Sequence, residues 1–166
     1  AGAGAEIGFG KLAKEMIANE FKLIVFDWDG TLMDSEARIV GCMRSALAEA
    51  GCVPLADAHI RDIIGLGLGE AILDLLPEES AATRLTVEER YRHHCLHGGG
   101  QPSPLFPGAE QTLRRLAERD YLLAVATGKS RRGLQRAFDE SGLEPLFQAT
   151  RCADETFSKP RPQMLL

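Results

Sequence analysis

The stretch "FKLIVFDWDGTLMDSE", residues 21–36, decides the fold and the chemistry expected of this chain. Its segment KLIVF is short and rich in β-branched and aromatic residues, which favours a buried parallel strand. Asp27 and Asp29 follow, and Gly30 lets the chain turn sharply away. Side chains two apart on an extended segment point to the same side. Both carboxylates are therefore predicted to face one site, while Trp28 faces the other way.

Two carboxylates held that close repel each other, which favours a bound cation or a proton kept on one of them. Either outcome suits phosphoryl transfer: one carboxylate attacks phosphorus, the other carries the proton, and a divalent cation offsets the phosphate charge. The alternative is an Asx-turn after a strand, a common use of Asp followed by Gly. The apolar strand before the pair and Gly30-Thr31 after it favour the functional interpretation.

The residues after this stretch predict a group of helices. Residues 35–50 carry apolar side chains every four positions behind Asp34 or Ser35 as N-cap, and Gly51 follows as a stop. Further helix-compatible segments lie at 57–64, 69–76 and 86–97, and a stretch dense in Gly and Pro, residues 98–108, then ends the group.

The second half of the chain alternates helices and strands. An amphipathic helix carrying Leu113 leads into the strand candidate YLLAVA, Ser130 caps another helix that ends at Gly142, and residues 146–150 form a third strand candidate. This order predicts an α/β fold with parallel strands joined by right-handed crossovers. Ligands in such sheets bind beyond the carboxyl ends of the strands, which puts Asp27, Asp29 and Thr127-Gly128 on one rim.

Composition and charge limit the kinds of partner that this chain is expected to bind. The chain has 166 residues, 45% of them hydrophobic and 26% charged, as expected of a globular protein with a real core. Acidic residues outnumber basic ones, 24 to 19, without a basic stripe, so nucleic acid is not an expected partner. No apolar stretch approaches the roughly 20 residues that span a bilayer. Neither nucleic acid nor a membrane is therefore an expected partner, and the protein is expected to be a monomer or a homodimer.

The cysteines and the first residues bear on location. Four dispersed cysteines without a C-x-x-C pair favour a reduced, cytoplasmic setting. Residues 1–15 lack the basic and apolar regions of a secretory signal. Residues 1–20 are interpreted as a leader or tag-like segment, and Met16 is an alternative native start.

Three motifs now carry a resemblance. FDWDGTL is similar to the D-x-D-G-T signature of the haloacid dehalogenase-like hydrolase superfamily, and VATGKS and SKPRPQML stand at the positions of its second and third motifs. The resemblance implies that Asp27 is a nucleophile phosphorylated during turnover and that Asp29 is the general acid and base. It further implies that Thr127 hydrogen-bonds the phosphoryl group and that Lys159 neutralises it and holds Asp27.

The resemblance also implies a cofactor and a substrate. Mg²⁺ would bind the Asp27 carboxylate and the backbone carbonyl of Asp29. The helical insertion resembles the α-helical cap of the phosphoglycolate phosphatase and β-phosphoglucomutase-like branch, whose substrates are small phosphorylated metabolites of the phosphoglycolate or sugar phosphate type. Thr31, Gly128 and the cap turn at Gly65-Leu66 are the expected substrate-binding positions.

The implied architecture is a Rossmann-like three-layer core, residues 21–33 and 108–166, with an inserted helical cap, residues 34–107. The family's fourth motif, an acidic segment that completes the metal site, does not follow Lys159. The core is therefore expected to be incomplete at its C-terminus, and the third metal ligand is undecided. A phosphomutase of the same chemistry and a non-catalytic protein that binds phosphate or a protein partner are the alternatives to a phosphatase.

Other motifs are weaker. The GKS at residues 128–130 lacks the glycine that a P-loop needs at position 123. His93 and His97 have helical i, i+4 spacing, but no third distant ligand is evident, so an ordinary helix end is favoured over a zinc site. GLGLGE at 65–70 does not follow a strand, and a flexible turn within the cap that reaches the substrate is favoured over a dinucleotide fingerprint.

Overall fold

Three parallel strands form the centre of this computed structural model, which describes residues 21–98 and 103–166. The strands β1 (Leu23–Phe26), β2 (Leu122–Thr127) and β3 (Ala149–Cys152) lie in the order β1, β2, β3. The register pairs Phe26 with Val125 and Thr127 with Cys152. The carboxyl ends of all three strands therefore meet at one edge of the sheet. The predicted α/β fold with a parallel sheet is confirmed.

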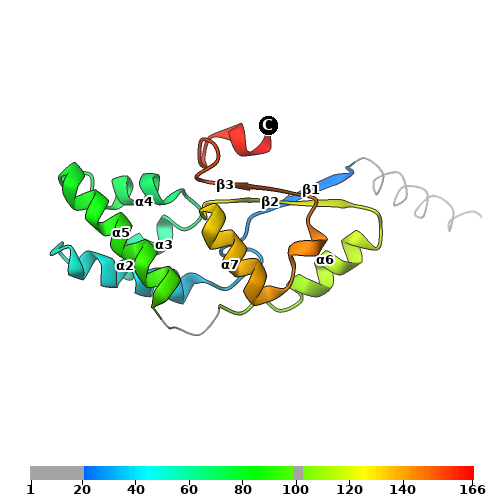
Figure 1. Cartoon of the computed structure of the whole chain (residues 1–166), viewed down its shortest axis with the longest axis horizontal. Coiled ribbons are helices and arrows are strands. Elements are labelled where there is room, and N and C mark those ends of the chain that lie inside the picture. The colour runs from blue at the N-terminus through cyan, green and yellow to red at the C-terminus, as the bar shows by residue number, and fades with distance from the viewer. Residues whose placement is uncertain (1–20, 99–102) are drawn as a thin grey trace, which may run out of the picture.

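Helices α6 (Ala109–Ala117) and α7 (Arg131–Ser141) and the 3-10 turn η1 (Glu144–Leu146) lie below the sheet in Figure 1. The turn η2 (Pro162–Leu165) lies on the other side, near β3. Strands and helices enclose a core cluster that includes Trp28, Leu113, Leu123, Val125, Leu134 and Phe138. Trp28 is fully buried, its ring meets that of Phe138 edge to face at 5.1 Å, and its indole N–H donates to the sulfur of Met33 at 3.4 Å.

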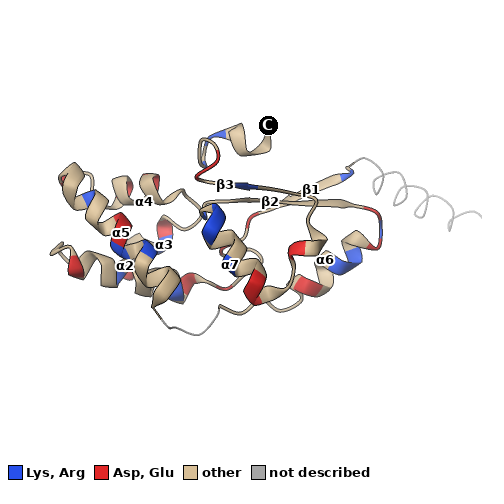
Figure 2. Cartoon of the chain, in the orientation of Figure 1, with Lys and Arg blue, Asp and Glu red and all other residues tan. Residues whose placement is uncertain are grey.

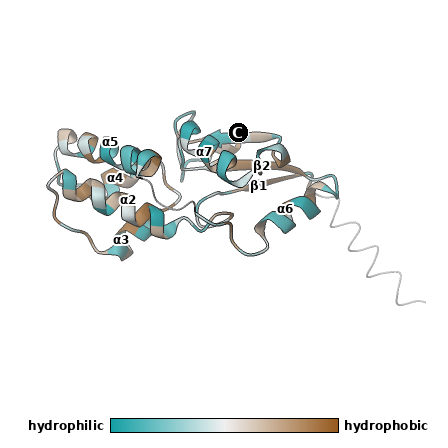
Figure 3. Ribbon diagram, turned by 60° about the horizontal axis from the view of Figure 1, so that its bottom comes forward, coloured by the Kyte–Doolittle hydropathy of each residue, from teal (hydrophilic) through white to brown (hydrophobic). Residues whose placement is uncertain are grey.

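Four helices form a second group beyond the carboxyl ends of the strands (Figures 1 and 3). They are α2 (Glu36–Glu49), α3 (Asp57–Asp62), α4 (Leu68–Leu75) and α5 (Ala81–His97). Their apolar faces form a helical cluster that includes Val40, Met43, Leu47, Ile60, Ile72 and Val87. The two clusters are separate groups of buried residues, so the helices have an apolar interior of their own.

Most element boundaries follow the local signals, with two corrections. Helix α5 begins at Ala81 instead of residue 86, because the Ser80 hydroxyl caps it by accepting the N–H of Thr83 at 3.0 Å. The third strand begins at Ala149 instead of residue 146. Leu146 ends η1 and Phe147 follows that turn; both pack against the core cluster, where the Phe147 ring lies 6.2 Å from that of Trp28 between centroids. The predictions for residues 1–20 and 99–102 fall outside the described residues.

The surface carries both signs of charge. Figure 2 shows Lys and Arg interspersed with Asp and Glu along the helices, and Figure 3 shows hydrophobic strands beside hydrophilic helix faces. No helix within the described residues has the length and apolar character needed to cross a membrane.

Candidate active site

Asp27 follows β1 and its carboxylate is held by two donors. The backbone N–H of Trp28 donates to Oδ1 at 2.8 Å, and the Lys159 ammonium lies 2.9 Å from the same oxygen. Lys159 comes from the loop before η2, 132 positions along the chain from Asp27. The structure thus brings together the two residues that the first and third motifs contribute. Oδ2 of Asp27 points toward Gly65, whose position for a Cβ atom lies 3.6 Å away.

Asp29 is buried and is held by different partners. Ser35 donates its hydroxyl hydrogen to Oδ1 at 2.5 Å, and the Lys129 ammonium lies 3.0 Å from that oxygen. Ser35 stands at the predicted N-cap position of α2, but its side chain makes no capping hydrogen bond to that helix. The capping role is corrected: a hydrogen bond to a buried carboxylate is stronger than one to a neutral backbone N–H, and the hydroxyl turns to Asp29.

Thr127 ends β2 and is fully buried. Its Oγ1 accepts the backbone N–H of Lys129 at 3.1 Å, which fixes the oxygen and leaves the hydroxyl hydrogen free to donate elsewhere. The N-terminus of α7 follows at once, and Ser130 caps it as predicted by accepting the N–H of Gly133 at 3.2 Å.

A turn between α3 and α4 reaches both core loops. A Cβ atom on Gly128 would lie 2.2 Å from the carbonyl oxygen of Leu66 and 2.8 Å from that of Gly65. A Cβ atom on Gly67 would lie 2.5 Å from the Ser158 hydroxyl. Only residues without a side chain allow so close an approach. The structure therefore places Gly65, Leu66 and Gly128 together.

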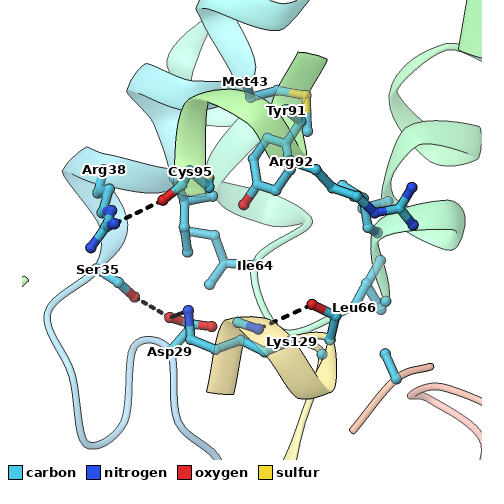
Figure 4. A pocket seen from close by; sticks show the side chains of 18 of the residues that line it. Asp29, Ser35, Arg38, Met43, Ile64, Leu66, Tyr91, Arg92, Cys95 and Lys129 are labelled. Carbon is cyan, nitrogen blue, oxygen red and sulfur yellow. Dashed lines mark hydrogen bonds and ion pairs between the residues drawn. The ribbon is translucent and has the colours of Figure 1, made fainter. Parts of the chain in front are cut away.

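A cavity of about 750 Å³ lies between the helical group and the core, within the range of small-molecule sites. Figure 4 shows Asp29, Ser35 and Lys129 on one side and Tyr91 and Cys95 of α5 facing them. Gly65, Leu66 and Gly128 line it as well.

Four expected site residues are not among the described residues that line the cavity: Asp27, Thr31, Thr127 and Lys159. Asp27 faces the glycine turn instead, because a Cβ atom on Gly65 would lie 3.6 Å from its Oδ2. Thr31 is also exposed.

A model of the haloacid dehalogenase-like hydrolase family matches residues 24–166. The chain belongs to this family. It is 29% identical over 139 residues to a phosphoglycolate phosphatase of Vibrio vulnificus (strain CMCP6), covering 80% of this chain and 61% of that protein. It is 33% identical over 149 residues to "Probable phosphatase IndB" of Dickeya dadantii (strain 3937), covering 86% and 64%. The resemblance to the superfamily and to its phosphoglycolate phosphatase-like branch is confirmed.

Solved structures of similar fold agree with this family membership. One from Bacteroides fragilis, described as a haloacid dehalogenase-like hydrolase, superposes with a TM-score of 0.80 at 25% identity and covers 88% of this chain and 70% of that one. The chain spans about three fifths of the length of the curated relatives given above.

The haloacid dehalogenase-like site offers oxygen ligands to a cation. The Asp27 carboxylate and the Asp29 carbonyl are hard oxygen donors of the kind that Mg²⁺ takes, and Mg²⁺ is commonly held by one or two carboxylates together with waters and substrate phosphate. Within residues 21–98 and 103–166, no three His, Cys, Asp or Glu side chains gather into a group able to hold a metal. The residues present fit a cation that substrate and solvent help to hold.

The cavity wall on α5 carries polar groups that stay protonated at neutral pH. Burial raises the pKa of Tyr91 well above its ordinary value, and Cys95 beside it adds to the rise. A hydrogen bond with Cys42 and burial raise the pKa of Cys95. The hydrogen bond from Cys95 in turn lowers the pKa of Cys42, although burial opposes this. This wall therefore presents a neutral hydroxyl and a neutral thiol to the cavity.

Sequence reasoning missed two residues of this haloacid dehalogenase-like site, Ser35 and Lys129. The sequence predicts Ser35 only as a cap, and Lys129 lies in the GKS segment, which lacks the glycine of a P-loop. Their adjacency to the first and second motifs was the available signal. Among the histidines of α5, His94 Nε2 lies 2.9 Å from Glu49, and the rings of His93 and His97 lie 5.4 Å apart.

Proposed function

We propose that this chain is a Mg²⁺-dependent phosphatase that hydrolyses a small phosphorylated metabolite of the phosphoglycolate or sugar phosphate type. The observation that carries the proposal is the ion pair between Asp27, which follows β1, and Lys159, with Thr127 at the end of the neighbouring strand β2. A carboxylate, an ammonium and a hydroxyl donor at one edge of a sheet are the groups that phosphoryl transfer through a carboxylate needs. The family and the phosphatase relatives support the same chemistry.

Asp27 attacks phosphorus through Oδ2. Its Oδ1 is occupied by the Trp28 N–H and the Lys159 ammonium, so Oδ2 keeps the free lone pairs. The phosphoryl group is held by Lys159, which offsets its charge, and by the Thr127 hydroxyl, whose hydrogen is free. The bond between phosphorus and the leaving oxygen breaks as the bond to Asp27 forms, giving an aspartyl-phosphate.

Asp29 moves the protons. It donates one to the leaving oxygen in the first step and takes one from water in the second, when that water attacks phosphorus and releases phosphate from Asp27. Its position on the cavity side suits contact with the leaving group. Mg²⁺, held by the Asp27 carboxylate and the Asp29 carbonyl, would offset the negative charge of the phosphate when bound.

Residues 34–107 act as a cap in this proposal. Their glycine turn at Gly65-Leu66 closes over Asp27, and closure keeps bulk water from the reacting group. The reaction takes place in the cytoplasm on a small diffusible substrate, with the protein a monomer or homodimer.

The test is hydrolysis of p-nitrophenyl phosphate and of a panel of phosphate esters by the full-length protein, with and without Mg²⁺. We expect Asp27→Asn to abolish release of inorganic phosphate while the melting curve stays close to that of the wild type. Acid quench of the wild type during turnover should trap phosphate on protein in a form that hydroxylamine removes. Absence of any turnover across the panel would overturn the proposal in favour of a phosphate-binding or partner-binding protein.

The same experiment separates hydrolysis from transfer. If phosphate appears on a sugar hydroxyl instead of in solution, the reaction is that of a mutase, and water is not the acceptor.

A further inference from the structure

The Lys129 ammonium is a charged group at the site that the proposed mechanism does not use. It lies 3.0 Å from Asp29 Oδ1, and Ser35 donates to the same oxygen at 2.5 Å. Lys129 stands at the start of α7 and Ser35 at the start of α2, so the two donors approach the carboxylate from different elements. Figure 4 shows both beside Asp29 at the cavity.

We propose that Lys129 is a positioning residue for Asp29, holding Oδ1 in place so that Oδ2 is the oxygen that carries the proton toward the leaving group. This inference rests on the proposed function, in which Asp29 is the general acid. Oδ1 accepts from two donors and has little remaining capacity for a proton, whereas Oδ2 has no donor among the described residues. The two donors therefore restrict the rotation of the carboxyl group and leave Oδ2 as the oxygen free to face the leaving group.

A second observation separates Lys129 from Lys159. Lys159 pairs with Asp27, outside the cavity lining, while Lys129 lines the cavity on the leaving-group side. Each lysine thus holds one aspartate. Loss of Lys129 should impair proton delivery to the leaving group and leave the attack by Asp27 intact.

The experiment uses leaving groups that differ in their need for a proton. Para-substituted aryl phosphates, from p-nitrophenyl to unsubstituted phenyl phosphate, keep one shape while the departing oxygen becomes more basic. The measured quantity is kcat/KM, because it covers the steps up to departure of the leaving group and excludes hydrolysis of the phosphoenzyme. A well-placed general acid contributes roughly 100-fold or more where the leaving group is basic, and little where it departs readily as an anion.

We expect Lys129→Met to lower kcat/KM for phenyl phosphate roughly 10-fold more than for p-nitrophenyl phosphate, since a misplaced acid loses part of its contribution. Lys129→Arg keeps a cationic donor and should restore much of the wild type's weak dependence of kcat/KM on the basicity of the leaving group. Ser35→Ala should make that dependence stronger, as Lys129→Met does. Lys22→Met, an exposed lysine before β1, is the matched control and should leave the series unchanged.

Asp29→Asn distinguishes the two ways of failing. If this variant lowers kcat/KM equally for all esters, Asp29 is not the general acid, and the mechanism proposed above fails together with this inference. A second outcome would overturn the role of Lys129 alone. In it, Asp29→Asn strengthens the dependence of kcat/KM on leaving-group basicity, but Lys129→Met and Lys129→Arg both lower kcat/KM equally for all esters or change it for none. Melting curves recorded for each variant show whether it is folded.

Discussion

The interior of the core and the junction between core and helical group are built from different chemistry. The interior is apolar and aromatic: Trp28 meets Phe138 at 5.1 Å and Phe147 at 6.2 Å between ring centroids, with Leu123 and Leu134 fully buried nearby. Packing of this kind restricts side chains to one arrangement. It fixes the strand ends from which Asp27 and Thr127 emerge.

The junction is made of charged groups and glycines. Glu140 of α7 binds Arg136 at 2.7 Å and Arg38 of α2 at 3.3 Å. Both arginines donate to the last turn of α5, Arg38 to the Cys95 carbonyl at 2.8 Å and Arg136 to the same carbonyl at 3.2 Å. Cations at a helix C-terminus are favourably placed.

Polar contacts of this kind exchange with water at a modest cost, whereas opening the aromatic cluster would expose a large apolar area. The core should therefore stay rigid while the helical group can move as a unit. Such movement would open and close the cavity above Asp29. Three substitutions test this division, beginning with the largest expected effect.

Replacing Trp28 with alanine should cost about 3–5 kcal/mol of unfolding free energy, because it leaves a cavity in the centre of the core cluster. Urea denaturation followed by circular dichroism measures the loss. Phe157→Ala is the control, since that ring is 61% exposed and its removal should change stability by less than about 1 kcal/mol. Equal losses in the two variants would contradict the rigid core.

Replacing Gly128 with alanine should oppose closure and leave the core intact. The new Cβ atom would lie 2.2 Å from the Leu66 carbonyl oxygen, and overpacking of this kind costs about 2 kcal/mol, which corresponds to a loss of roughly 30-fold in kcat/KM. The free energy of unfolding, measured by thermal melting, should stay within about 0.5 kcal/mol of the wild-type value.

Gly41→Ala is the matched control for that substitution. A Cβ atom on Gly41, in α2, would have nothing within 4 Å, so activity should be unchanged. Unaltered activity in Gly128→Ala would mean that the contact with Leu66 is not part of turnover.

Features that depend on local sequence could be predicted, whereas features that depend on contacts between distant residues could not. The strand before Asp27, the helix cap at Ser130 and the parallel sheet are confirmed. The predicted burial of that strand is wrong, because Leu23 is 50% and Val25 39% exposed. The predicted start of β3 is wrong because the position of Phe147 is determined by packing against Trp28, which is far away in the sequence, and not by the residues next to it. Long-range packing of this kind leaves no local signal.

The partners of the two aspartates show the same limit. The motifs indicated Lys159 for Asp27, and the structure brings the two within 2.9 Å. Adjacency to the first and second motifs places Ser35 and Lys129 near the site, but it does not indicate that both side chains contact Asp29. Both contacts depend on how α2 and α7 meet at the strand ends, which only the assembled fold determines.

Replacing Glu140 with glutamine should give the smallest effect, about 1 kcal/mol at pH 7, because both arginines keep their carbonyl partners. Burial alone would raise the pKa of Glu140, but the hydrogen bond from Arg136 and the charge of Arg38 outweigh burial and hold that pKa below 4.5. A carboxylate with a lowered pKa stabilises the fold above its unfolded-state pKa, and this stability is lost as the pH falls through the lower, folded-state value. The difference between wild type and Glu140→Gln should therefore be present at pH 7 and shrink as the pH falls below 4.5.

Glu110→Gln breaks the exposed pair with Arg114 on α6 and should cost less than about 0.5 kcal/mol. If the two variants melt alike at pH 7, the junction gains nothing from its charges, and the glycine contacts alone hold the helical group against the core.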